Sequence, residues 1–192
     1  MLREEAYNLL KDKVQNQNLI KHCVAAGACM RALAEYFNDP STGFGAGEIE
    51  KWGITGILHD IDYEDTKNEP IKHSIIGAGI LEKLGIDKEI VEAVKTHNEI
   101  HEIAPQSRMA KAIYCVDPLT GLIVASTLVL PSKKIADLTT ENVLNRFKEK
   151  GFARGANREI IAKCHVLLDL PLENFIKICL EAMKKINNEL GL

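Results

Sequence analysis

The sequence predicts an all-α fold. Along most of its 192 residues, apolar side chains recur every three to four positions, which is the spacing of one helix face. No stretch alternates apolar and polar side chains convincingly in the way that a half-buried strand would. Capping residues, glycines and prolines divide the periodic segments into pieces of helical length.

The first half of the chain contains five such segments. Helices are expected at about 3–14, 18–37, 48–58, 70–84 and 87–97. Turn-forming residues break the chain at 38–47, and 62–69 is a polar, acidic loop. Pro70 suits the first turn of a helix, Gly85 its end, and Asp87 an N-cap.

Further helices follow in the second half. They are expected at about 107–130, from Thr139 or Thr140 to about 150, from Asn157, and from Pro171. The glycine-containing loop 151–155 separates the second of these helices from the third. The apolar face of the last helix is expected to consist of Phe175, Cys179, Met183, Ile186 and Leu190.

Composition points to one domain over 1–192 that can bury its own core, with 46% hydrophobic and 27% charged residues. The net charge of −3 argues against binding to a nucleic-acid duplex. Segment 131–163 carries eight Lys or Arg and four Asp or Glu, a local excess of +4 that leaves −7 for the rest. We therefore expect a small anionic partner, and a homodimer is left open.

The cysteine pattern and the absence of a long apolar run predict a cytoplasmic protein without a membrane span. The five cysteines include no CxxC pair and each lies in an apolar stretch, so we interpret them as reduced core thiols. The longest apolar run, 119–130, is too short to span a bilayer. The N-terminus is charged and amphipathic, unlike a signal peptide.

Four residues give the first indication of a metal site, because imidazole and carboxylate are ligands of Zn, Mn, Fe and Ni. The pair His59-Asp60 ends an apolar run, so both side chains can turn inward there. His22 lies on a buried helix face and could instead be a core histidine bonded to backbone. Asp117 interrupts an apolar helix, and burying its carboxylate without a cation would cost several kcal/mol; the alternative is an exposed residue before Pro118.

His73 and His97 are the next candidates, on the fourth and fifth expected helices. Either histidine could simply be solvated at a helix end, where a C-terminal imidazole also gains from the helix dipole. His101 follows His97 by four residues, so it would lie one turn further on if the helix continued.

The order His22, His59-Asp60, His73, His97, Asp117 resembles the HD superfamily, particularly its HDIG-type hydrolases. Residues 57–62 read Ile-Leu-His-Asp-Ile-Asp, where the family has Leu-Leu-His-Asp-Ile-Gly. The resemblance covers a motif core of about 15–130 and leaves 131–192 as a basic helical extension. It implies a helical bundle with the metal site between helices, and metal-dependent hydrolysis of phosphate esters.

The resemblance also implies roles for individual residues. His22, His59, Asp60 and Asp117 would hold a first divalent ion. Asp60 would bridge to a second ion held by His73 and His97, and it would orient the nucleophilic water as the catalytic carboxylate. With a mononuclear site, His73 and His97 would contact substrate instead.

Departures from the family pattern leave the chemistry open. The Lys of an HDIGK motif and the GYP motif are missing, which disfavours cyclic-dinucleotide hydrolysis, and Asn98 stands where a second His is usual. His101 could supply that ligand or contact substrate. Di-iron oxygenases of the same superfamily have ligands in this same order, and a non-catalytic nucleotide-binding module is the third hypothesis.

The basic segment supplies candidates for phosphate binding. Arg154 and Arg158 lie at a loop followed by a helix N-terminus, where backbone N–H groups suit an anion. Lys133 belongs to the same positive region. The alternative is a solvated helix face with a structural Arg. The leading hypothesis is a metal-dependent phosphohydrolase, a phosphomonoesterase or phosphodiesterase, with one or two ions of Mn, Fe, Ni or Zn and a small phosphorylated metabolite or nucleotide as substrate.

Overall fold

The computed structural model describes residues 1–38 and 45–192, and this part of the chain is helical without any strand. Its α-helices are α1 Arg3–Lys13, α2 Gln17–Phe37, α3 Ala46–Leu58, α4 Tyr63–Thr66, α5 Ile75–Lys83, α6 Lys88–Thr96, α7 Arg108–Leu128, α8 Thr140–Lys148, α9 Arg158–Ala162, α10 Cys164–Leu168, α11 Leu172–Lys185 and α12 Asn187–Leu190. Two 3₁₀ turns, η2 Glu99–His101 and η3 Ile135–Asp137, complete it. The predicted all-α fold is confirmed.

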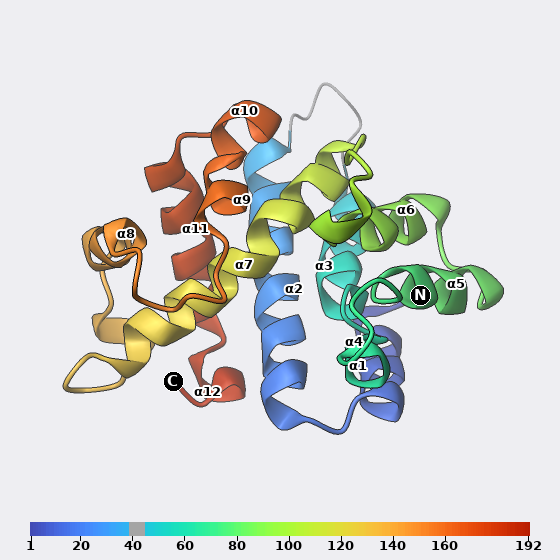
Figure 1. Cartoon of the computed structure of the whole chain (residues 1–192), viewed down its shortest axis with the longest axis horizontal. Coiled ribbons are helices and arrows are strands. Elements are labelled where there is room, and N and C mark those ends of the chain that lie inside the picture. The colour runs from blue at the N-terminus through green and yellow to red at the C-terminus, as the bar shows by residue number, and fades with distance from the viewer. Residues whose placement is uncertain (39–44) are drawn as a thin grey trace.

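Helices α2 and α7 cross at the centre of the molecule (Figure 1). Helices α3, α5 and α6 lie on one side of this crossing, and α8 to α11 lie on the other. Buried apolar side chains form one core cluster that extends from Ala6 in α1 to Leu190 in α12. The basic extension therefore shares its core with the motif-bearing helices.

Glycines allow α2 and α3 to approach each other closely. A Cβ atom added to Gly56 would lie 2.5 Å from the backbone nitrogen of Gly27, so no side chain fits between the two helices there. His22 lies on α2 five residues before Gly27, and His59 follows α3 directly. This contact brings the histidines of two separate helices together.

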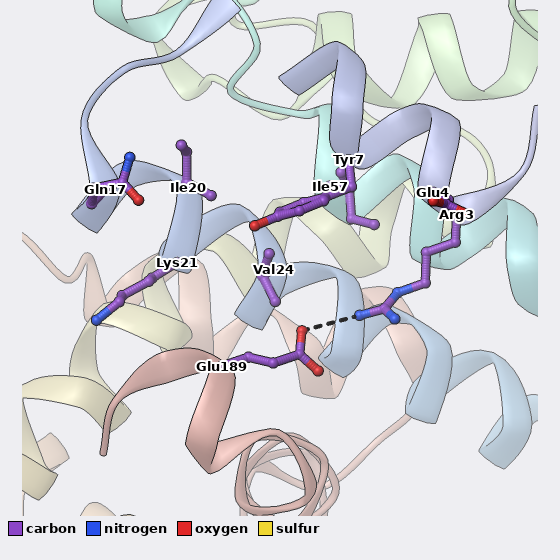
Figure 2. Close-up of a pocket in the computed structure, with 9 residues that line it drawn as sticks. All are labelled: Arg3, Glu4, Tyr7, Gln17, Ile20, Lys21, Val24, Ile57 and Glu189. Carbon is purple, nitrogen blue, oxygen red and sulfur yellow. Dashed lines mark ion pairs between the residues drawn. The ribbon is translucent and has the colours of Figure 1, made fainter. Parts of the chain in front are cut away.

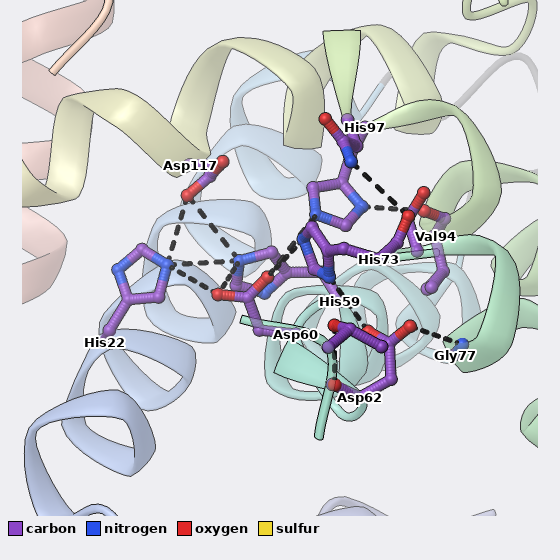
Figure 3. Close-up of polar contacts among 12 residues, drawn as sticks. His22, His59, Asp60, Asp62, His73, Gly77, Val94, His97 and Asp117 are labelled. Atoms are coloured by element: carbon purple, nitrogen blue, oxygen red, sulfur yellow. Dashed lines mark hydrogen bonds and ion pairs between the residues drawn. The ribbon is translucent and has the colours of Figure 1, made fainter. Parts of the chain in front are cut away.

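Helix α7 is the one helix in the described part of the chain that is long and apolar enough to cross a membrane. In the structure, 67% of its most apolar window is buried inside the protein, as in the central helix of a bundle. Asp117 lies at mid-length and faces α2, the side on which the other predicted ligands gather (Figure 3).

All five cysteines are buried and unpaired, which agrees with core thiols. Burial raises the pKa of Cys115 to about 12 and that of Cys164 to about 11. Burial likewise raises the pKa of Cys23 and Cys179 well above the usual range. These four thiols therefore stay protonated near neutral pH and contribute packing rather than reactivity.

Several expected boundaries were wrong. No helix starts at Pro70: residues 70–74 form a turn, Ser74 has φ 70°, and α5 begins only at Ile75. The acidic loop contains the short helix α4, and the last expected helix breaks at Ile186 into α11 and α12. The segment from Asn157 forms two short helices, α9 and α10. Of the predicted break at 38–47, residues 39–44 lie outside the described residues.

Candidate metal centre

The His59-Asp60 pair follows the last residue of α3, where the chain leaves the helix in a turn. His59 is fully buried, and Asp60 is 6% exposed. His59 Nε2 lies 3.5 Å from Asp60 Oδ2, so the two neighbouring side chains point into the same space. The end of a helix allows this orientation, as predicted from the sequence.

Two further residues complete a first cluster around this pair (Figure 3). His22 Nε2, from α2, lies 3.1 Å from His59 Nε2 and 3.4 Å from Asp60 Oδ2. Asp117 Oδ1, from α7, lies 3.1 Å from His22 Nε2 and 3.7 Å from His59 Nε2. One ligand atom from each of the four residues lies within 4.8 Å of all the others, which is compact enough to hold one metal ion.

A second cluster forms on the other oxygen of Asp60. His73 Nε2 lies 3.2 Å and His97 Nε2 3.4 Å from Asp60 Oδ1, and the two imidazole nitrogens are 3.2 Å apart. The structure thus places all six predicted ligands at one centre, with Asp60 shared between the two clusters.

Hydrogen bonds at the far side of each imidazole fix which nitrogen faces the centre. His59 Nδ1 donates to the Gly56 carbonyl at 2.8 Å, and His97 Nδ1 donates to the Val94 carbonyl at 2.6 Å. A carbonyl can only accept, so the proton of each neutral ring lies on Nδ1 and Nε2 presents its lone pair. This outer support is typical of metal-binding histidines.

His22 and His73 receive the same support from side chains. His22 Nδ1 lies 3.0 Å from Thr120 Oγ1, and this hydroxyl donates its own proton to the Asp117 carbonyl at 2.8 Å. The hydroxyl must therefore accept from His22. His73 Nδ1 donates to Asp62 Oδ1 at 2.9 Å. All four Nε2 atoms consequently point inward as potential ligands.

The carboxylates of the centre strongly favour positively charged groups beside them. Burial alone would lower the pKa of His22, but Asp117 and Asp60 outweigh this effect and raise it to about 10. Burial also opposes protonation of His73, and Asp60 and Asp62 raise its pKa to about 9. Although burial favours their neutral forms, neighbouring imidazoles hold the pKa of Asp60 and that of Asp117 well below the usual range. Protons or divalent cations can supply the required charge, so metal binding competes with protonation.

The centre opens into a cleft of about 560 Å³, a size suited to a small ligand. Its walls include Asn18 of α2, Tyr63 of α4, Lys67, Asn98 and Gly155. Lys67 is exposed and is the one Lys or Arg among the described residues that line this cleft.

A second cavity, of about 520 Å³, lies between α1, α2 and α12 (Figure 2). Arg3 and Glu189 pair across it at 3.5 Å, and Val24 and Ile57 contribute apolar surface. None of the six ligand residues lines it, so we assign the chemistry to the first cleft.

The structure gives His101 a different role from the one predicted. Its Nε2 donates to the backbone carbonyl of His73 at 2.7 Å, so it does not replace the missing ligand. Asn98 Nδ2 donates to the same carbonyl at 3.3 Å. Both residues therefore support the turn that carries His73, and His101 does not line the cleft.

None of the three predicted phosphate-binding cations lines the cleft. The Arg158 guanidinium donates to the carbonyls of Phe152, Ala153 and Ala156, so it holds its own loop together. Helix α7 ends at Leu128, eleven residues after Asp117, which corresponds to about 16 Å along the helix axis. Lys133 lies beyond this end of the helix. Arg154 is exposed beside Gly155 at the cleft, and its role in substrate binding stays a prediction.

Sequence reasoning missed three residues of this site. Asp62 was treated only as a departure from the family motif, yet it is fully buried and bonded to His73. Thr120 lies three residues after Asp117 on α7, a spacing that could have indicated a partner on the same helix face. Lys67 lies in a polar loop, and nothing in its local sequence marks it.

Comparison with known proteins places the chain in a family. Residues 19–122 match the HD domain, which is more than half of the chain, so the protein belongs to the HD-domain family. Ribonuclease Y of Lawsonia intracellularis is 29% identical over 148 residues, which cover 75% of this chain and 26% of that protein. Ribonuclease Y of Nitratidesulfovibrio vulgaris is 29% identical over 151 residues, covering 76% and 27%.

The chain thus spans about a quarter of the length of the ribonuclease Y relatives that it matches. An uncharacterized protein of Methanocaldococcus jannaschii is 26% identical over 179 residues, which cover 91% of this chain and 98% of that protein. No solved structure matches the chain.

Proposed function

We propose that this chain is a two-metal phosphohydrolase that acts on a small phosphorylated metabolite or nucleotide. The observation that carries the proposal is the position of Asp60: each of its carboxylate oxygens faces a different histidine cluster. Two ions held on either side of one carboxylate are the arrangement that serves in-line displacement at phosphorus.

The residues divide into two ligand sets. His22, His59, Asp60 and Asp117 would hold one ion, and Asp60, His73 and His97 the other. Imidazole and carboxylate donors suit Mn, Fe, Ni or Zn. When bound, such ions acidify a water molecule and stabilise the charge that develops on the phosphoryl oxygens. The outer hydrogen bonds keep every Nε2 aimed at the centre before any ion arrives.

Charge complementarity supports a phosphorylated substrate. Two divalent ions carry four positive charges, and the carboxylates of Asp60, Asp62 and Asp117 offset three of them, so the loaded centre would attract an anionic phosphate group. On the cleft wall, Lys67 adds one cation and Glu99 one carboxylate. The ribonuclease Y relatives are named for action on a phosphodiester polymer, so short RNA belongs among the candidate substrates.

The test is turnover of the Mn²⁺-loaded protein with phosphomonoesters, nucleotides and a short single-stranded RNA, with and without oxygen. We expect metal-dependent hydrolysis that is equal in air and under nitrogen. Turnover that requires reduced iron and oxygen would establish the di-iron oxygenase hypothesis instead. Thermal stabilisation by nucleotides without turnover of any substrate would establish a binding module.

Substitution Lys67→Ala tests the substrate side of the cleft. We expect KM for the phosphorylated substrate to rise about two- to fivefold with kcat nearly unchanged, because an exposed cation contributes only about 0.2–1 kcal/mol. Lys72→Ala is the matched control, since Lys72 pairs with Glu69 and does not line the cleft. Equal KM values for both variants would exclude Lys67 from substrate binding.

A further inference from the structure

His73 is held differently from the other three histidines of the centre. His22 lies within α2, and His59 and His97 directly follow α3 and α6. His73 lies instead in the turn 70–74, next to Ser74 with its φ of 70°. No helix fixes its ring, so its orientation depends on contacts with more distant residues.

Asp62 supplies the contact that orients this ring (Figure 3). Its carboxylate has no solvent exposure and both oxygens are used: Oδ1 accepts from His73 Nδ1 at 2.9 Å, and Oδ2 accepts from the Gly77 backbone N–H at 2.7 Å. Gly77 is the third residue of α5, so the carboxylate also caps that helix. Ser74 makes no such cap, because its hydroxyl donates to the Lys95 carbonyl.

Close packing fixes the carboxylate itself. A Cβ atom on Gly77 would lie 3.1 Å from both Cγ and Oδ1 of Asp62, so the carboxylate lies directly against the helix backbone. The Asp62 carboxylate bonds to His73 and Gly77, and to none of His22, His59 and Asp117, the residues that belong to the first cluster alone. Its direct contact with the centre is therefore through His73, a residue of the second cluster alone.

We propose that Asp62 is a positioning residue that determines binding of the second metal ion. It holds His73 in the tautomer that carries its proton on Nδ1 and directs the lone pair of Nε2 toward the ion. This inference rests on the proposed function, and it concerns one ion only. A carboxylate on the outer nitrogen fixes the imidazole proton there and makes the inner nitrogen a better ligand.

Substitution Asp62→Asn isolates this effect, because a carboxamide has one acceptor oxygen where the carboxylate has two. The Gly77 N–H cannot change, so it keeps the oxygen and the amide NH₂ faces His73 Nδ1. The imidazole then accepts at Nδ1 and carries its proton on Nε2, where it blocks the ion. Long-range ¹H–¹⁵N spectra of the metal-free protein should show this change of tautomer.

Calorimetric titration with Mn²⁺ measures the consequence. We expect two ions per wild-type chain, and in Asp62→Asn a loss of about 10- to 100-fold in affinity for one of them only. Asp65→Asn, at an exposed position of α4, the short helix that Asp62 precedes, is the matched control and should bind both ions normally. Gly77→Ala, which displaces the carboxylate without removing it, should weaken the same ion to a smaller extent.

Several outcomes would overturn the inference. Equal binding by Asp62→Asn and wild type would do so, as would loss of both ions or a wild-type stoichiometry below two. The wild-type protein could bind two ions and Asp62→Asn only one, while neither shows phosphohydrolase turnover. That result would contradict the proposed function but would support the role of Asp62.

Discussion

Substitution Asp60→Asn should abolish metal-dependent turnover and weaken both ions together. The carboxamide has one oxygen ligand and no charge, so it cannot serve the two clusters that share Asp60. Each ion contributes several kcal/mol of transition-state stabilisation. We therefore expect kcat/KM to fall by about a thousandfold or more. Turnover measured alongside Mn²⁺ stoichiometry distinguishes loss of metal from loss of chemistry.

The control for this variant is Asp137→Asn, which makes the same carboxylate-to-carboxamide change at an exposed aspartate in η3. It should leave both metal binding and turnover unchanged. Retention of metal-dependent turnover by Asp60→Asn would contradict the assignment of Asp60 as the shared ligand.

Substitution Gly56→Ala should destabilise the fold and disrupt the first cluster at the same time. The added Cβ would lie 2.5 Å from Gly27 N and 2.6 Å from Gly27 Cα, both of them backbone atoms that cannot rotate away. Overpacking of this kind costs about 1–3 kcal/mol or more. Because His22 and His59 depend on the spacing of α2 and α3, we expect metal affinity to fall as well. Thermal unfolding and Mn²⁺ titration measure the two effects.

Gly47→Ala is the matched control on the same helix, because a Cβ at Gly47 meets nothing within 4 Å. It should leave metal binding unchanged and raise stability by up to about 1 kcal/mol through helix propensity. Equal unfolding midpoints for the two alanine variants would show that α2 and α3 are not in tight contact at Gly56.

The helices and the convergence of the six candidate ligands could be predicted from the sequence because their evidence is local or ordered along the chain. Helical periodicity shows which face is buried, and it placed Asp117 as a carboxylate in an apolar helix. The order of histidines and aspartates matched a known family. The structure adds what order cannot contain, namely that Asp60 directs its two oxygens to different clusters.

The differences between expectation and structure depend on particular side-chain contacts. The helix expected from Pro70 fails because Asp62, eight residues earlier, caps α5 at Gly77 and holds His73 on a turn. Arg158 looked like a phosphate ligand, but its loop already supplies three carbonyl acceptors. Such contacts leave no periodic pattern, so composition and spacing alone could not reveal them.

Anomalous diffraction from crystals grown with Mn²⁺ would locate the ions directly. We expect two peaks about 3.5–4 Å apart, one on each side of the Asp60 carboxylate. The first peak should lie among His22, His59 and Asp117, and the second between His73 and His97. A single peak confined to the first cluster, or peaks away from Asp60, would contradict a two-metal centre.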